Sequence, residues 1–150
     1  TIGNALVTNG VKWLEEYASQ YDINYRFRDC NNDTLLSYAI SDRGSNGYLY
    51  LLQKGANEFL VNDEGESIIH SIVYSGISER LNILLKNRLE AISLIDAQTN
   101  EGVTPLLLAV TLNDYSMCRH LINLGADVNV ADETNSSPYI RRVLWDMGIL

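Results

Sequence analysis

The chain has 150 residues, of which 46% are hydrophobic and 20% charged, a composition that excludes intrinsic disorder and suits one domain with a sizeable core. Its net charge is −8, because 19 acidic residues outnumber 11 basic ones. This charge argues against nucleic acid, which needs a Lys/Arg surface, and against anionic membranes. An acidic surface favours a basic partner, although the same charge also suits a surface that only keeps a protein soluble.

No run of 18 or more apolar residues occurs, so we expect no membrane-spanning helix. The first residue is Thr1 and not methionine, which indicates a trimmed or processed chain. Two cysteines, Cys30 and Cys118, are too few for a disulfide framework, and the repeats described below separate them by two units. We therefore expect free thiols and a reducing compartment, the cytoplasm.

Residues 1–24 are expected to form an N-terminal cap. Val11, Leu14 and Tyr17–Ala18 recur at helical spacing as one apolar face, and residues 22–24 suit the exit turn. The charged side chains expected on the outer face of this cap are Lys12, Glu15 and Glu16.

Three segments of similar layout follow, at residues 25–57, 58–94 and 95–127, and a shorter one occupies 128–150. Each has a Ser or Thr before an apolar stretch, at spacings of 33, 37 and 33 residues: Thr34, Ser67, Thr104 and Ser137. Such a residue is a helix N-cap, and Pro105 and Pro138 follow it where a missing N–H is harmless. We predict a helix start within two residues of each cap.

Within each segment the pattern predicts two antiparallel helices. Gly76 and Asn113 suit the turn between them, and Gly55 and Gly125 suit the end of the second helix. Leu51 and Leu121 fall at the same core position of two second helices. The Ser67 copy lacks the closing glycine and carries four extra residues within 89–96, so either its helices are longer or the following loop bulges.

The last segment is expected to hold a hairpin and a capping helix from Pro138. We place Tyr139, Ile140, Val143 and Leu144 on its buried side. The polar residues assigned to its outer face are Arg141, Arg142 and Asp146. The apolar pair Ile149–Leu150 at the end indicates either a shortened helix or a further domain.

Residues 102–106 read Gly-Val-Thr-Pro-Leu, and residues 121–129 read Leu-Ile-Asn-Leu-Gly-Ala-Asp-Val-Asn. With the 33-residue period, these motifs resemble the ankyrin-repeat family. The resemblance implies an all-α solenoid of antiparallel helix pairs with β-turn fingertips, about three full repeats and two capping units. It also implies that His70, at the motif histidine position, bridges neighbouring repeats by hydrogen bonds; Leu107 and Ser37 replace that histidine in other copies.

No catalytic, cofactor or metal site is predicted. His70 and His120 are the only histidines, and neither lies in a nucleophile motif. Two isolated cysteines and two isolated histidines do not supply the ligand spacing of a zinc site. The glycine-containing residues 44–47 follow no strand and lack a phosphate-binding lysine. We therefore expect a protein that is not an enzyme.

The resemblance implies a partner site on the fingertips and the concave face. The residues carried over to it are Asp33, Asp63, Glu64, Glu66, Tyr74, Glu101, Leu112, Glu133 and Trp145. The fingertips are expected to be acidic without Lys or Arg, around a palm that is more apolar toward the C-terminus. Alternatively, the acidic residues serve only as turn formers, and Trp145 fills the core of the cap.

The expected function is a monomeric interaction module that binds another protein through a basic patch of that partner. It could be an adaptor, or an inhibitor or immunity-type protein that covers a basic enzyme. The alternative is a targeting or substrate-recruiting segment of a larger multidomain enzyme or effector.

Overall fold

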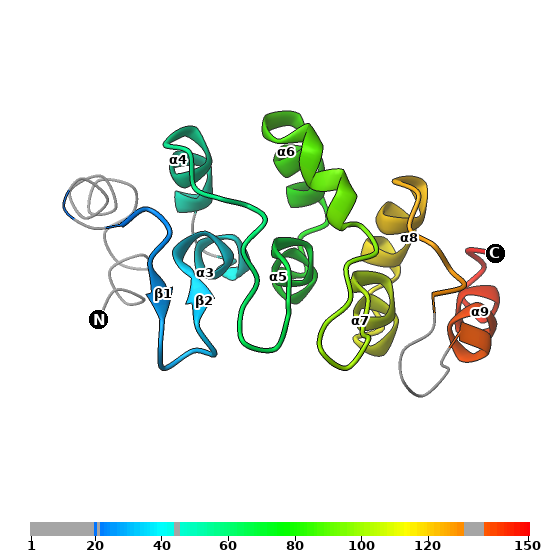
Figure 1. The fold of residues 1–150 in the computed structure, drawn as a ribbon. Helices are drawn as coiled ribbons and strands as arrows, with labels where there is room; N and C mark the ends of the chain where they lie inside the picture. Colours follow the sequence, from blue (N-terminus) through cyan, green and yellow to red (C-terminus); the bar gives the residue numbers. More distant parts are fainter. Residues whose placement is uncertain (1–19, 21, 44–45, 131–136) are drawn as a thin grey trace.

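The computed structural model describes residues 20, 22–43, 46–130 and 137–150, and it shows two layers of helices (Figure 1). One layer holds α3 (Leu35–Ser41), α5 (Ile68–Ser75), α7 (Pro105–Thr111) and α9 (Ser137–Asp146). The other holds α4 (Gly47–Gln53), α6 (Glu79–Asn87) and α8 (Tyr115–Asn123). Successive helices of the first layer pack on one another, and the all-α solenoid is confirmed.

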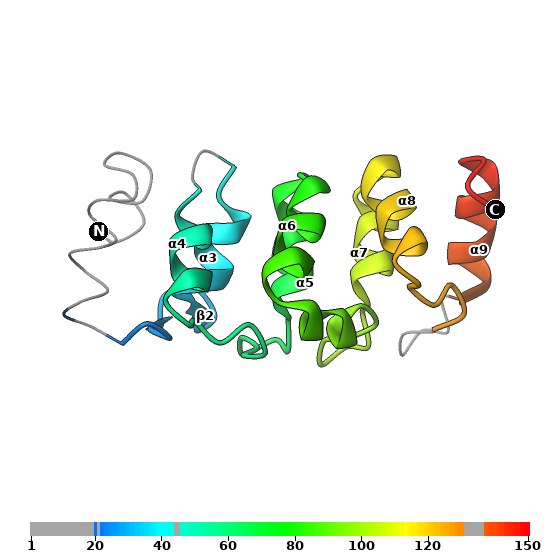
Figure 2. The same cartoon turned by 90° about the horizontal axis from the view of Figure 1, so that it is seen from above.

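The loops between helix pairs project from one side of the layers as fingers (Figure 1). The first finger is an antiparallel hairpin of β1 (Arg26–Phe27) and β2 (Asp33–Thr34). Seen from above, the helix pairs stand in a single row in the order of the sequence (Figure 2). None of the described helices has the length and apolar character needed to cross a membrane.

The predicted helix starts are confirmed. Helices α3, α5 and α7 begin one residue after Thr34, Ser67 and Thr104, and α9 begins at Ser137. The Thr34 hydroxyl accepts a hydrogen bond from the Ser37 N–H at 3.0 Å. The equivalent bond from the Leu107 N–H to Thr104 measures 3.2 Å, with Pro105 at the first helical position. The caps therefore satisfy backbone donors that a helix start leaves open.

The second helices end in the same way in two copies. Gly55 and Gly125 have φ values of +86° and +96°, a left-handed conformation that glycine adopts without strain. The next residue, Ala56 or Ala126, then donates its N–H back to Leu51 or Leu121 at 3.0 Å. These bonds close each helix and turn the chain toward the next finger.

The four extra residues of the Ser67 copy do not lengthen its helices. Helix α6 has nine residues, as α8 does, and the additional chain forms a separate 3₁₀ helix, η1 (Leu89–Leu94). Ala91 anchors η1 in the core. Arg88, just before η1, donates to the Leu52 carbonyl and lies 3.6 Å from the Glu58 carboxylate.

One residue of the C-terminal helix lies elsewhere than predicted. Ile140 and Leu144 are buried and Val143 half-buried as expected, but Tyr139 is 56% exposed. Its counterparts in the other copies, such as Leu106, are buried. Tyr139 instead lies in the lining of a groove beside α7.

Parts of the predicted organisation lie outside the described residues, notably the apolar face of the N-terminal cap and Glu133. Within the described chain, the first two helix pairs and η1 fall in residues 25–57 and 58–94, α7 and α8 in 95–127, and α9 in 128–150. The exact unit boundaries remain a prediction. Cys30 is exposed, Cys118 is buried, and both are free thiols as predicted.

Leu51 and Leu121 are both fully buried, as predicted. We expect Leu51→Ala and Leu121→Ala each to lower the free energy of unfolding by about 2–5 kcal/mol, because each leaves a cavity between helices. Chemical denaturation followed by circular dichroism measures this. Leu89→Ala is the matched control, since Leu89 is 70% exposed and its truncation should cost no more than about 0.5 kcal/mol. Equal midpoints for the core and control variants would contradict the assigned core.

Candidate functional site: an acidic groove on the concave face

Neighbouring fingers are joined through their backbones. The Asp63 N–H donates to the Asn31 carbonyl at 2.9 Å, and the Asn100 N–H donates to the Glu64 carbonyl at 2.9 Å. The same bond thus recurs from the first finger to the second and from the second to the third. It aligns the three fingertips along the solenoid.

Asparagine side chains strengthen the same joints. The Asn31 amide donates to the Glu64 carboxylate at 2.9 Å, and the Asn32 amide donates to Asp63 at 2.8 Å. The Asn100 amide donates to the Asp63 carbonyl at 2.8 Å. These bonds join residues 31 to 37 positions apart, so no local pattern in the sequence indicates them. The acidic fingertip residues therefore have structural partners that sequence reasoning did not anticipate.

Asn62 is the centre of this network and is buried. Its amide nitrogen donates to Asp33 at 2.9 Å and to Glu66 at 2.7 Å. Its amide oxygen accepts the backbone N–H groups of Glu64 and Glu66 at 3.0 and 2.9 Å. Asn62 thus holds two carboxylates of neighbouring fingers in one place.

Burial, together with the neighbouring carboxylates, raises the pKa of two side chains in this network. Burial raises the pKa of Asp33 above 3.8 and the negative charge of Glu66 raises it further, while the hydrogen bond from Asn62 lowers it. The Tyr74 hydroxyl donates to Glu66 at 2.7 Å. Burial, this bond and the surrounding carboxylates raise the pKa of Tyr74, so its hydroxyl remains a donor.

His70 connects the second repeat with the third finger. One ring nitrogen, Nε2, lies 2.8 Å from the Val103 carbonyl, and Nδ1 lies within 3.1 Å of the backbone N–H and the hydroxyl of Ser67. A carbonyl only accepts, so Nε2 carries the proton and Nδ1 accepts. Burial lowers the pKa of His70 and keeps it neutral. The predicted bridging role of His70 is confirmed.

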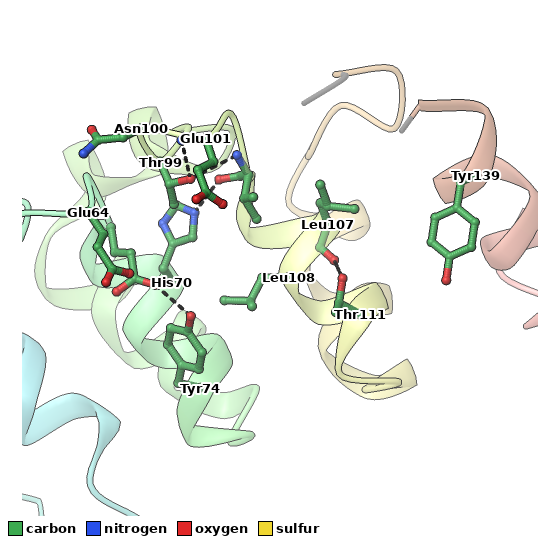
Figure 3. Close-up of a pocket in the computed structure, with 12 residues that line it drawn as sticks. Glu64, His70, Tyr74, Thr99, Asn100, Glu101, Leu107, Leu108, Thr111 and Tyr139 are labelled. Atoms are coloured by element: carbon green, nitrogen blue, oxygen red, sulfur yellow. Dashed lines mark hydrogen bonds between the residues drawn. The ribbon is translucent and has the colours of Figure 1, made fainter. Parts of the chain in front are cut away.

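A groove of about 580 Å³ opens between the second and third fingers, α5 and α7 (Figure 3). Its lining consists of Glu64, Glu66, His70, Tyr74, Thr99, Asn100, Glu101, Val103, Leu107, Leu108, Thr111 and Tyr139. Four of the predicted partner-binding residues therefore meet in one place: Glu64, Glu66, Tyr74 and Glu101. No lysine or arginine belongs to this lining.

The other predicted site residues that the structure describes do not line the groove. Asp33 and Asp63 lie in the fingertip network beside it. Leu112 is 48% exposed at the end of α7, and Trp145 is 71% exposed on α9, so Trp145 does not fill the core of the cap. Sequence reasoning did not place Leu107, Leu108 and Tyr139 in the partner site, because the packing of α5, α7 and α9 that brings these residues together is not encoded in their spacing.

The prediction that fingertips lack basic residues is wrong for the first finger. Arg28 is exposed in the turn between β1 and β2. Arg26, on β1, donates to the carbonyls of Asn32 and Val61 and so ties its own finger to the next segment. The acidic character is therefore concentrated on the second and third fingers, where the groove lies.

The hydrogen-bonded pair of Ser67 and His70 serves the structure of the repeats. Ser67 and His70 are hydrogen-bonded, but both are buried and engaged in capping α5 and joining repeats. In the described part of the chain, no three His, Cys, Asp or Glu side chains are grouped so that they could hold a metal ion.

Stacked helix pairs with aligned, hydrogen-bonded fingers define a repeat solenoid of the ankyrin type. The family model described as ankyrin repeats (3 copies) matches residues 49–132, more than half of the chain. The chain therefore belongs to the ankyrin-repeat family. Ankyrin repeats are protein–protein interaction modules.

Several larger proteins carry a similar segment. The Nuclear factor NF-kappa-B p105 subunit of Gallus gallus is 33% identical over 116 residues, which cover 75% of this chain and 12% of that protein. Neurogenic locus notch homolog protein 2 of Homo sapiens is 36% identical over 87 residues, which cover 58% of this chain and 3% of that protein. Phosphocholine transferase AnkX of Legionella pneumophila is 34% identical over 91 residues, which cover 59% of this chain and 9% of that protein. The chain thus spans only a small part of these relatives.

The neutral state of His70 makes stability depend on pH. Because the pKa of folded His70 is below its ordinary 6.5, its contribution is full above about pH 6.5 and is lost as the pH falls through the lowered value. We expect His70→Gln to lower the free energy of unfolding by about 1–3 kcal/mol near pH 7.5, by unpairing buried groups. This difference from the parent should shrink toward about pH 5, as denaturation at several pH values would show. His120→Gln, on α8 and away from the joint between α5 and the third finger, is the control and should cost no more than about 0.5 kcal/mol near pH 7.5.

The position of Asn62 between two carboxylates predicts a charge effect. Asn62→Asp keeps the acceptor for two backbone N–H groups but replaces the donor to Asp33 and Glu66 with a third carboxylate. We expect a loss of about 1–3 kcal/mol near pH 7. The new carboxyl would have a raised folded-state pKa, so the loss should diminish as the pH falls below about 5. Asn57→Asp, an exposed position with one backbone donor, is the control and should cost less than about 0.5 kcal/mol. A cost for Asn62→Asp that is independent of pH would argue against like-charge repulsion.

Proposed function

We propose that this chain is a non-enzymatic interaction module that binds a protein partner with a basic patch through the acidic groove and the fingertips around it. The observation that carries this proposal is the lining of the groove. Three carboxylates, Glu64, Glu66 and Glu101, surround it, and no lysine or arginine in the lining neutralises them. A concave surface of one charge attracts a partner of the opposite charge and repels others.

The groove also has the apolar surface that a lasting complex needs. Leu107, Leu108 and Val103 contribute apolar lining, and Tyr74 and Tyr139 add partly exposed aromatic rings. An apolar centre with a charged rim is the usual construction of a protein interface, and aromatic residues often dominate its energy. Leu112 and Trp145, both exposed, extend the proposed contact beyond the groove toward the C-terminal end.

Two biological settings are consistent with such a module. In the first, the chain acts as an adaptor or as an inhibitor or immunity-type protein that covers a basic enzyme, as a monomer in the cytoplasm. In the second, it is a targeting or substrate-recruiting segment of a larger protein. The small share of each compared relative that the match covers, 12% or less, favours the second setting, and one of them is named as a phosphocholine transferase.

Charge removal in the groove should slow binding. Glutamine keeps the shape and an acceptor oxygen of glutamate, so Glu64→Gln with Glu101→Gln removes two charges while preserving the bond from Asn31. The partners are basic proteins that bind to the immobilised parent chain. At low salt, we expect their association rate constant with the variant to be about threefold to tenfold lower than with the parent. The difference should fade above about 0.15 M salt, where charges are screened over about 8 Å. Surface plasmon resonance with purified partners measures the association rate and the dissociation rate.

The matched control removes the same charge elsewhere. Glu79→Gln with Glu90→Gln alters two exposed residues on α6 and η1, outside the groove, and should leave association unchanged. Tyr74→Ala and Leu112→Ala should instead speed dissociation, because apolar contacts act mainly after the encounter. If the association rate changes neither with salt nor with Glu64→Gln and Glu101→Gln, the acidic groove is only a solubilising surface.

A further inference from the structure

The groove has two chemically different ends. Glu64, Glu101 and Tyr74 lie toward the fingertips and α5, whereas Leu107 and Thr111 project from α7 and Tyr139 closes the opposite end (Figure 3). Leu108 lies between these two groups (Figure 3). A ligand that fills the groove therefore meets carboxylates at one end and apolar surface at the other.

The carboxylates at the acidic end keep capacity for further hydrogen bonds. Both oxygens of Glu66 already accept one bond, from Tyr74 and from Asn62. Glu64 uses one oxygen to accept from Asn31. Glu101 is exposed and lines the groove, and the bond that it donates to the Thr99 hydroxyl uses its backbone N–H and not its carboxylate. Each carboxylate oxygen has two acceptor positions, so this end can receive a group with several donors.

We infer that the groove takes an arginine side chain from an extended segment of the partner, with an apolar side chain of the same segment against Leu108 and Tyr139. This inference rests on the proposed function and specifies the chemistry of its partner. Guanidinium offers five donors in a planar fork, pairs with carboxylates in a bidentate manner and stacks on aromatic rings. Lysine offers a compact charge that satisfies fewer of the acceptors at the Glu64–Glu101 end.

The shape of the groove supports a side chain on an extended segment. A volume of about 580 Å³ lies within the range of about 300–1,000 Å³ typical of ligand sites, which is ample for two side chains and their backbone. A methylated lysine would need an aromatic cage around its ammonium group. Tyr74 and Tyr139 lie at opposite ends of the groove and so form no such cage (Figure 3).

The test uses fluorescein-labelled pools of short peptides and the full chain, measured by fluorescence polarisation. One pool has arginine at a fixed central position and randomised uncharged neighbours; two matched pools have citrulline or lysine there. Citrulline keeps the size of arginine without its charge. We expect the arginine pool to bind at least about tenfold more tightly than the citrulline pool, and more tightly than the lysine pool. Removing leucine, isoleucine and phenylalanine from the neighbouring positions should weaken binding of the arginine pool.

Matched variants test which peptide side chain binds at each end of the groove. Glu101→Gln should reduce the preference for arginine over citrulline, whereas Glu90→Gln should not, because Glu90 lies on η1. Tyr139→Ser should weaken binding only of the arginine pool that contains apolar neighbours. Tyr115→Ser is its control, since Tyr115 on α8 is 54% exposed and lies outside the groove.

The outcomes separate this inference from the proposed function. If the citrulline or lysine pool binds as tightly as the arginine pool, while a captured partner still depends on Glu64 and Glu101, the arginine assignment is overturned and the proposed function stands. If these substitutions change the binding of neither the peptides nor any protein partner, both the arginine assignment and the proposed function are overturned. Arginine selection that is lost in Glu101→Gln and retained in Glu90→Gln supports both.

Discussion

The backbone hydrogen bonds between neighbouring fingertips determine where the charged side chains of this protein lie. Each helix pair could tilt against the next, because its apolar contacts are not directional. The bonds from Asp63 to Asn31 and from Asn100 to Glu64 are directional, and they fix the fingers in line. Once the fingers are aligned, carboxylates from consecutive repeats face one concave surface. The acidic groove is therefore a product of the repeat stacking itself.

Gathering carboxylates in this way opposes folding, because like charges repel and lose contact with water. Asparagine amides offset much of this cost without neutralising the charge. Asn62 places two donors between Asp33 and Glu66, and Asn31 supplies another to Glu64. A lysine at position 62 would lack the oxygen that accepts two backbone N–H groups, and its charge would cancel part of the field of the groove. The use of neutral donors preserves a surface that can attract a basic partner.

Local signals in the sequence were sufficient to predict the helices but not the groove. Thr34 and Thr104 mark helix starts because a cap needs only residues three positions apart, and the prediction holds there. The predicted burial of Tyr139 was wrong, because this side chain lines the groove instead of packing in the core. The bonds of Asn31 and Asn62 cross between repeats and leave no periodic signature within one repeat. The charged groove residues were predicted as exposed fingertip positions, while the apolar lining depends on the packing of α7 beside α5 and α9, which spacing alone does not encode.

The groove is also linked to the stability of the solenoid. Val103 lines it, and the Val103 carbonyl is held by His70 from the preceding repeat. The third finger thus keeps its position only while α5 and α7 stay packed, and solenoid repeats open by losing contacts with their neighbours. A ligand that bridges Glu64 on one finger and Glu101 on the next would add a connection across the same interface. Binding and repeat stacking would then reinforce one another, so that a partner tightens the joint on which its own site depends.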